Sequence, residues 1–362
     1  MADAAMQLDD VPATPAIEID NVSVTFGQGQ NQVRAIDRIS LDVRDGEFLT
    51  LIGHSGCGKS TLLKIMAGLV PPTTGRVVLD GRPVLGPRPD IGMMFQQATL
   101  LPWKTTIENI VLPIEIREGR GAAKAARARA MDLLELVGLG DFADVYPGEL
   151  SGGMAQRASI CRMLVADPAM LLLDEPFSNL DADLRRRLSL DVREILKTLG
   201  ISAILVTHDQ QEAFAMCDQV AVLKDGGIQQ WDVPYNLYHE PANRFVAGFV
   251  GQGGFVPGKA LGPDTIESEL GVIRGNRAYT WQPGTLVDVL IRPDDIVYDA
   301  NSELKPKVVE KTFAGTSTLY RFRCSEDTEF EALFRSHLDF NLGEHVPVRV
   351  EADHLIAFER TT

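Results

Sequence analysis

Cysteine is scarce in this sequence, and its spacing excludes two kinds of stabilised domain. Four cysteines occur among 362 residues, namely Cys57, Cys161, Cys217 and Cys324, and no two of them form a C-x-x-C pair. Disulfide frameworks and structural zinc sites both require cysteines at close, repeated spacings. The sequence therefore predicts neither, and its scattered cysteines are typical of a protein from a reducing compartment.

Long apolar runs are missing as well. Hydrophobic residues make up 45% of the chain, but runs such as 203–206 are far shorter than the roughly 18–20 residues of a membrane-spanning helix. Residues 1–6 show no basic segment followed by an apolar core, so we expect no secretory signal. We expect a soluble chain that reaches the cytoplasmic side of the cell (inner) membrane as a peripheral protein, through a protein partner and without inserting into lipid.

The sequence also lacks an excess of positively charged residues. The 35 Lys and Arg residues face 50 Asp and Glu residues, which gives a formal net charge of −15. Such a charge opposes general binding to nucleic acid or to anionic lipid. We therefore expect neither of these among the partners of the chain.

One short segment that is present points to a specific ligand. A nine-residue segment contains the eight-residue pattern G-x-x-x-x-G-K-[ST], whose backbone N–H groups wrap the phosphates of a nucleotide. Glycines let the main chain approach anionic oxygens, a lysine can place charge on the β and γ phosphates, and a serine hydroxyl can complete a Mg²⁺ shell. The segment consists of Gly53, His54, Ser55, Gly56, Cys57, Gly58, Lys59, Ser60 and Thr61.

The surroundings of this loop support the same interpretation. Residues 47–52 are apolar and predict a buried strand before the loop, and residues 60–67 predict a helix after it. The N-terminus of that helix would then face the phosphates, where its exposed N–H groups favour negative charge. The sequence therefore predicts a nucleotide-binding site.

Four later segments narrow the class of nucleotide-binding protein. Residues 150–157 read LSGGMAQR, residues 170–176 read MLLLDEP, residues 178–181 read SNLD, and residues 206–209 read VTHD. Together with the phosphate loop, in this order, they resemble the ATP-binding subunit of an ABC transporter. The resemblance covers roughly residues 17–250 and implies an ATPase that couples hydrolysis to transmembrane import.

The fold class follows from the same resemblance and from the pattern of elements. Strands and helices alternate over residues 17–250, which predicts an α/β P-loop NTPase (ABC ATPase) domain with a largely parallel sheet and helices on both faces. A helical subdomain is expected at about residues 97–165, and a flexible N-terminal extension over residues 1–16. Beyond residue 254 the chain turns to short β-like runs, so residues 254–362 predict a small all-β barrel.

This C-terminal segment resembles the OB-like regulatory domain behind importer ATPases. Its predicted strands cover residues 287–291, 308–313, 319–323, 330–334 and 346–350. An OB fold can bind RNA, which leaves a non-transport, nucleic-acid-binding ABC-type ATPase as an alternative of another class. However, residues 254–362 contain 12 Lys and Arg against 18 Asp and Glu, a net charge of −6. Such a surface repels phosphate backbones, so a regulatory or dimerising role is favoured.

Two neighbouring acidic residues are the candidates for metal binding and catalysis. Asp174 ends a strongly apolar run, where an acidic side chain is costly unless it serves a cation, so we assign it to Mg²⁺. Glu175 follows at the predicted edge of the sheet and is the candidate general base that orients water. Phosphoryl transfer needs mainly such positioning and electrostatic stabilisation.

Three further roles are implied by the resemblance alone. Gln96 stands where the family carries a glutamine that touches Mg²⁺ and the attacking water, with the adjacent Gln97 as the alternative. His208 matches the family's γ-phosphate sensor, and its titration range suits a switchable hydrogen-bond partner. Phe26 matches the aromatic residue that stacks on adenine, although a strand residue of the core would look the same in the sequence.

The resemblance also implies that the active unit is a homodimer. Ser151, Gly152 and Gly153 open a predicted helix and would close over the γ-phosphate held by the opposite subunit, while Asp181 would shape the dimer contact. Met154 departs from the glutamine that is commonest in the family at its position. Closure around two ATP molecules would move attached integral membrane permeases, for which Leu101-Pro102-Trp103 is a candidate docking surface.

We expect no residue of this chain to touch the transported solute, because permeases and a solute-binding protein select it. Residues 100–104 and Met154 resemble taurine, sulfonate and nitrate importers. Residues 176–185, residues 243–249 and the β-rich C-terminal segment resemble ferric-iron, sulfate and polyamine importers. The second group carries the extra domain, and within it we favour ferric iron.

Overall fold

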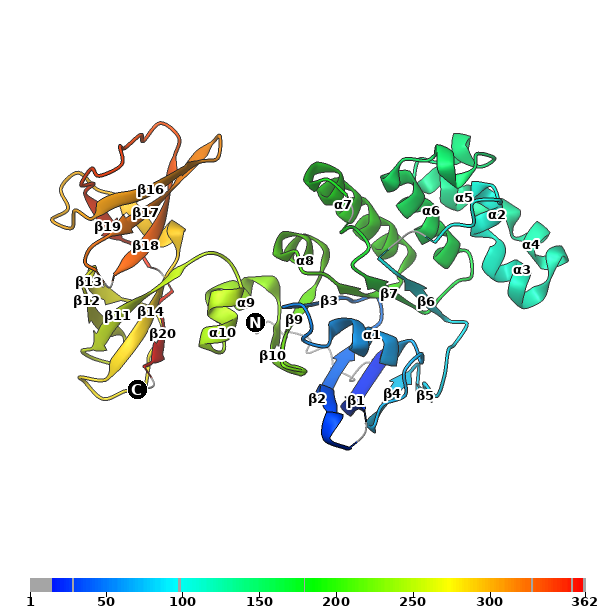
Figure 1. The fold of residues 1–362 in the computed structure, drawn as a ribbon, viewed down its shortest axis with the longest axis horizontal. Helices are drawn as coiled ribbons and strands as arrows, with labels where there is room; N and C mark the ends of the chain where they lie inside the picture. Colours follow the sequence, from blue (N-terminus) through cyan, green and yellow to red (C-terminus); the bar gives the residue numbers. More distant parts are fainter. Residues whose placement is uncertain are drawn as a thin grey trace, which may run out of the picture. The chain divides into compact units, whose positions relative to one another are not determined.

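The computed structural model describes residues 15–27, 29–96, 99–178, 180–326, 328–352 and 354–360. Contacts divide the chain into two compact units, Met1–Pro234 and Tyr235–Thr362. Figure 1 shows that the first unit is built from helices and strands and the second mainly from strands. The predicted α/β domain followed by an all-β domain is thus confirmed. Most of the predicted N-terminal extension, residues 1–14, lies outside the described residues, as does Gln97.

A six-stranded sheet forms the centre of the first unit, in the order β10-β9-β3-β8-β7-β6. Neighbouring strands from β9 to β6 pair in parallel, and only β10 is antiparallel to its neighbour. The central strands are apolar and buried, as expected for a parallel sheet covered on both faces. The strands are β3 (Phe48–Gly53), β6 (Ile91–Met94), β7 (Met170–Asp174), β8 (Ser202–Val206), β9 (Gln219–Lys224) and β10 (Gly227–Asp232).

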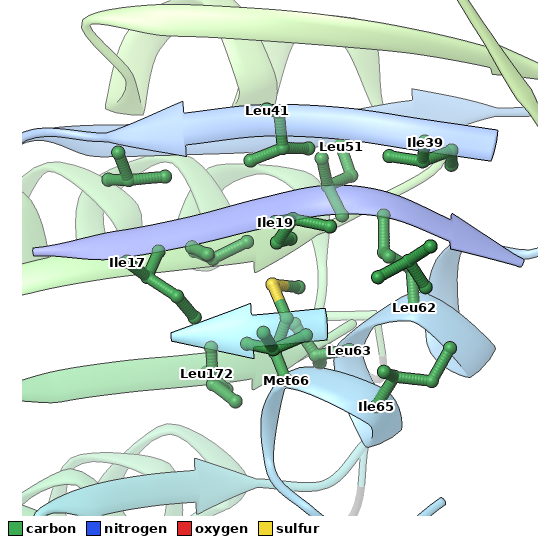
Figure 2. Close-up of a cluster of buried hydrophobic side chains, with 14 of the residues drawn as sticks. Ile17, Ile19, Ile39, Leu41, Leu51, Leu62, Leu63, Ile65, Met66 and Leu172 are labelled. Atoms are coloured by element: carbon green, nitrogen blue, oxygen red, sulfur yellow. The ribbon is translucent and has the colours of Figure 1, made fainter. Parts of the chain in front are cut away.

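A smaller antiparallel sheet packs beside the central one, in the order β2-β1-β4-β5. Figure 2 shows apolar side chains of this sheet, such as Ile19 and Leu41, facing Leu51 of β3 and Leu62 and Met66 of the first helix. This shared core fixes the position of that helix against both sheets. The strands are β1 (Ile17–Phe26), β2 (Val33–Val43), β4 (Thr74–Leu79) and β5 (Arg82–Pro83).

Helices cover the central sheet, and a group of them stands beside β6 in Figure 1. Helix α7 buries Leu188, Val192, Ile195 and Leu196, the spacing of one apolar face, and ends at Gly200 in the left-handed conformation. The helices of this unit are α1 (Lys59–Met66), α2 (Thr106–Ile110), α3 (Leu112–Glu118), α4 (Arg120–Ala125), α5 (Arg127–Leu136), α6 (Gly152–Leu164), α7 (Ala182–Leu199) and α8 (Gln210–Met216). No helix in the described part of the chain is long and apolar enough to cross a membrane.

The described residues of the second unit form three antiparallel sheets, ordered β13-β12-β11-β14-β20, β15-β19 and β16-β17-β18. Alternate residues of β17 and β18 point into an aromatic core that contains Tyr320, Phe322 and Phe330. The strands are β11 (Gly254–Ala260), β12 (Thr265–Ser268), β13 (Gly271–Arg274), β14 (Leu286–Ile291), β15 (Ile296–Tyr298), β16 (Lys307–Phe313), β17 (Ser317–Arg323), β18 (Glu329–Arg335), β19 (Val348–Val350) and β20 (Ile356–Glu359).

Two short helices, α9 (Pro234–His239) and α10 (Arg244–Phe249), connect the domains in sequence. The buried Arg292 links these helices to the β-strands of the second unit. Its guanidinium donates to the carbonyl oxygens of Tyr238, Val250 and Gln252, and it stacks on the Tyr238 ring, 3.8 Å from the ring centre. The contact boundary after Pro234 therefore falls at the first residue of α9, whereas the boundary predicted from sequence followed both helices.

Candidate functional site

The sequence-predicted motifs meet at one edge of the central sheet. The phosphate loop follows β3, Thr207 and His208 follow β8, Glu175 follows β7, and Phe95 and Gln96 follow β6. These four strands are adjacent and parallel. Their carboxyl ends therefore lie side by side, which is the edge where open α/β sheets bind ligands.

Two positions of the phosphate loop leave no room for a side chain and therefore require glycine. A Cβ atom on Gly53 would lie 2.4 Å from the carbonyl oxygen of Leu223, and one on Gly58 would lie 2.6 Å from that of Ala35. Gly58 also has a φ of 107° and forms the N-cap of α1. The tight turn delivers the chain into α1 with its first N–H groups at the loop, an arrangement suited to phosphate.

The side chain of Lys59 folds back and binds the start of the phosphate loop. Its side chain is buried, and its ammonium donates to the carbonyl oxygens of Gly53 at 2.7 Å and His54 at 3.1 Å. Both acceptors are neutral, so they satisfy hydrogen bonds without balancing the positive charge. An anion held by the loop would supply that balance. Cys57 is also buried, with its sulfur 3.8 Å from the same ammonium, whereas His54, Ser55 and Gly56 are exposed.

Ser60 and Asp174 come together from different motifs. The Ser60 hydroxyl donates to Oδ1 of Asp174 at 2.9 Å. Burial raises the pKa of Asp174 and the nearby Glu175 adds to the rise, while the Ser60 hydrogen bond, Lys64 and Lys59 oppose it. A hydroxyl beside a partly buried carboxylate provides the hard oxygen ligands that Mg²⁺ prefers, usually with waters and substrate phosphates as the rest. The residues present therefore fit a Mg²⁺ ion.

Glu175 and His208 form the second pair at this edge. Oε2 of Glu175 lies 3.4 Å from Nδ1 of His208. Glu175 has a φ of 47°, an uncommon conformation for a side chain of its size, and its N–H donates to the carbonyl oxygen of Val206 at 2.9 Å. Such backbone conformations persist where neighbouring structure fixes them, often at functional sites. The bond to Val206 supplies that constraint and aims the carboxylate toward His208.

Among the described residues, the contacts of Ser151, Gly152 and Gly153 lie with α6 and α7. Ser151 caps α6 by accepting from the N–H of Met154 at 3.3 Å. A Cβ atom on Gly153 would lie 3.0 Å from Cδ2 of Leu184, so the start of α6 packs closely against the start of α7. Asp181 caps α7 by accepting from the Leu184 N–H at 2.9 Å. Ser151 and Asp181 thus cap their own helices, and Gly153 packs against the neighbouring one.

Phe26 and Gln96 lie at the ends of their strands. Phe26 ends β1 opposite Val33 and is 47% exposed, so it is available at the surface and is not a core residue. Gln96 directly follows Phe95 beyond the end of β6 and is exposed. Both positions are compatible with contact to a bound nucleotide, and their assigned roles stay predictions.

Three residues at the site carried no role in the sequence analysis. The buried Gln156 on α6 donates through its amide to the carbonyl oxygen of Pro176, next to Glu175. Asp209 caps α8 and pairs with Arg185 of α7 at 2.8 Å. The spacing Asp-x-x-Glu at residues 209–212 is a capping signal that predicts the helix start. No comparable local signal marks Gln156 or Arg185.

Comparisons with known proteins match both units. The sequence profile described as "ABC transporter" matches residues 36–178, and that of the TOBE domain matches residues 289–358. The chain is 38% identical over 347 residues to the spermidine/putrescine import ATP-binding protein PotA of Thermobifida fusca, covering 92% of this chain and 90% of the relative. It is also 38% identical over 346 residues to the Fe(3+) ions import ATP-binding protein FbpC of Brucella melitensis, covering 94% and 88%.

Two solved structures are also similar to the chain. One is the dimeric structure of MJ0796, a bacterial ABC transporter cassette, with a TM-score of 0.53 and 32% identity. Another is the dimeric post-hydrolysis state of the same ATP-binding cassette bound to ADP and Pi, with a TM-score of 0.52 and 30% identity. Each covers 60% of this chain and 98% of the solved chain.

Proposed function

The chain belongs to the ATP-binding subunits of ABC transporters, and we propose that it hydrolyses ATP as a homodimer to drive solute import through partner permeases. The observation that supports this most is the meeting of Lys59, Ser60, Asp174, Glu175 and His208 at one sheet edge, with the Ser60–Asp174 and Glu175–His208 distances given above. This set contains a phosphate-binding cation, oxygen ligands for a metal, a base and a polar partner for the transferred phosphoryl group.

In this proposal the chain acts mainly by positioning. The loop N–H groups and Lys59 bind the β and γ phosphates, while Phe26 stacks on adenine. Ser60 and Asp174, with Gln96, hold Mg²⁺, which when bound neutralises charge on the phosphate oxygens. Glu175 orients the attacking water in line with the γ-phosphate, and His208 donates to that phosphate as the bond breaks.

The same proposal makes each ATP site composite. Ser151–Gly153 and Asp181 lie together at the starts of α6 and α7, and within the described part of the chain none of their hydrogen bonds reaches the phosphate loop. An exposed N-capping serine at a 13-residue helix presents N–H groups to an anion. We infer that these groups close over the γ-phosphate held by the second copy. The dimeric cassette structures support this inference.

We further propose a peripheral position on the cytoplasmic side of the cell membrane, with permeases as direct partners and a solute-binding protein as an indirect one. Ferric iron is the solute that we favour, and a polyamine is the second candidate. Relatives named for each import are 38% identical to this chain. The site at the sheet edge serves ATP and does not distinguish these two solutes.

Loss of this chain should stop uptake of ferric iron. Cells that lack the chain are incubated with radiolabelled ferric iron or, separately, with labelled spermidine. Iron uptake should fall to background and return with the wild-type chain but not with Lys59→Ala. If spermidine uptake is lost instead, the polyamine is the solute. Normal uptake of both would contradict both solute assignments.

Removal of the second unit should leave ATP binding intact. A chain that ends at Pro234 retains every residue assigned above to the nucleotide, since these lie between Phe26 and His208. Its affinity for a non-hydrolysable ATP analogue, measured by titration calorimetry, should stay within about twofold of the full chain, because compact units fold independently. Loss of ATP-analogue binding in a folded truncated chain would contradict the assignment of ATP binding to the first unit alone.

A chain ending at Gly251 provides the matched comparison. It keeps α9 and α10 but removes Arg292, which binds the carbonyl oxygens of Tyr238 in α9 and of Val250 directly after α10. It also removes Leu290 and Ile356, which pack on Ala247. Uncovered apolar surface of this kind promotes association. We expect this chain to bind the analogue as well but to aggregate more readily than the chain ending at Pro234.

A further inference from the structure

Glu212 is a buried carboxyl group that the proposed mechanism does not use. It lies in the first turn of α8 and is 7% exposed. Its Oε2 accepts a hydrogen bond from the Thr207 hydroxyl at 2.8 Å, whereas its Oε1 has no hydrogen-bond partner among the described residues. Burying a carboxyl group with one oxygen unpaired is costly. A residue that would merely fill this space could be apolar.

The hydrogen bonds around Glu212 have a fixed direction. The Thr207 hydroxyl accepts from the N–H of Asp209 at 3.0 Å. A hydroxyl has a single hydrogen to donate, and that hydrogen goes to Glu212. Asp209 in turn accepts from the N–H groups of Gln211 and Glu212 at 2.9 and 3.1 Å. These bonds tie together the residues on either side of His208.

Among the residues that the structure describes, few contacts hold the side chain of His208. Its side chain is 60% exposed, and the recorded contact of its ring is the 3.4 Å approach to Glu175. An exposed ring keeps its direction only if its backbone is fixed. Thr207 is almost fully buried and joined to Glu212, and Asp209 is held by α8 and by Arg185. The position of the imidazole therefore depends on this bonded segment.

We propose that Glu212 is a positioning residue for His208, which it acts on through the Thr207 hydroxyl. This inference rests on the proposed role of His208 at the γ-phosphate. In the described residues, Glu212 makes no hydrogen bond to Glu175 or to the phosphate loop. It anchors the turn between β8 and α8, so that the imidazole stays beside Glu175.

The pKa of Glu212 indicates that Thr207 requires its acceptor oxygen and not its negative charge. Burial raises the pKa of Glu212 to about 7, opposed by the Thr207 hydrogen bond and Arg185 and assisted by Asp209 and Glu175. A full negative charge is thus disfavoured there, and the acceptor oxygen is what Thr207 requires. Glutamine has the same shape and an acceptor oxygen but no charge. It should therefore substitute for Glu212.

The test measures steady-state ATP hydrolysis by the full-length chain. Glu212→Ala and Thr207→Val should each lower kcat about tenfold, the loss of one buried hydrogen bond, while KM for MgATP changes little. Glu212→Gln should retain most of the activity. The control is Ser189→Ala, which removes another buried hydroxyl bond, to the carbonyl oxygen of Arg185 at 2.7 Å, without touching residues 207–209. It should leave kcat unchanged.

Two double variants test whether Glu212, Thr207 and His208 act together. Glu212→Ala with Thr207→Val should be no slower than the slower single variant, and Glu212→Ala should have no further effect in a His208→Ala chain. Independent, multiplying effects would overturn the inference, as would a normal kcat in Glu212→Ala. Full activity of His208→Ala alone would instead refute the proposed role of His208.

A second measurement does not depend on activity. Hydrogen exchange of the Asp209 amide, which is bonded to Thr207, should be faster in Glu212→Ala and Thr207→Val but not in Ser189→Ala or Glu212→Gln. Unchanged exchange in both of the first two variants would show that Glu212 does not hold this turn.

Discussion

Glu175→Gln should bind MgATP with near wild-type affinity and hydrolyse it on the order of 10²–10⁴ times more slowly. Glutamine keeps the size of the side chain but removes the carboxylate that would orient water. The backbone of Glu175 should be unaffected, because its φ of 47° is held by the bond from its N–H to Val206. The variant should therefore accumulate a dimer with ATP enclosed, which sedimentation in the presence of MgATP would detect.

A glutamate elsewhere in the same unit provides the control. Glu194 is exposed on α7, and Glu194→Gln makes the same chemical change away from the sheet edge. Its hydrolysis rate should equal that of the wild type. Hydrolysis by Glu175→Gln within about twofold of wild type would exclude Glu175 as the group that positions water.

Lys59→Ala should lose most of the affinity for ATP. The buried ammonium is the cation closest to the loop carbonyls of Gly53 and His54, 2.7 and 3.1 Å away. Removing a charge-assisted contact to phosphate costs several kcal/mol when the site is shielded from water, so we expect an affinity loss of about 10²-fold or more. Titration of the full-length chain with an ATP analogue measures it.

Lys59→Ala also removes two hydrogen bonds within the phosphate loop, so the fold of the variant must be checked. Thermal unfolding followed by circular dichroism shows whether the chain remains folded. Lys124→Ala removes an exposed lysine from α4 and should change neither affinity nor unfolding temperature. A folded Lys59→Ala chain with wild-type affinity would contradict the assignment of Lys59 to phosphate.

Much of the fold was predictable because the signals are local. The apolar runs that became β3, β7 and β8 are buried on both sides, and the helical spacing of Leu188, Val192 and Ile195 describes α7. Five strands of the second unit were also predicted. The run 346–350 shortened to Val348–Val350, because Pro347 cannot donate a hydrogen bond within a sheet.

The elements that were missed lack such local signals. Strands β11 and β13 contain Gly254, Gly258 and Gly271, which weaken a strand pattern, and β12 has only four residues. Helices α9 and α10 have only six residues each, too short for a clear apolar period. Their attachment to the second unit depends on Arg292, which lies more than forty residues beyond α10.

The sequence by itself determined the phosphate loop, the order of the motifs and the chemical type of each candidate residue. Each of these depends on residues that are neighbours in the chain. Only the tertiary structure decided that Ser60 meets Asp174, that Glu175 meets His208 and that Glu212 holds the turn at His208. The physical reason is the strand order β3-β8-β7-β6, which differs from the order of the strands in the chain. Packing of the sheet, which no local pattern encodes, sets which loops lie side by side at its edge.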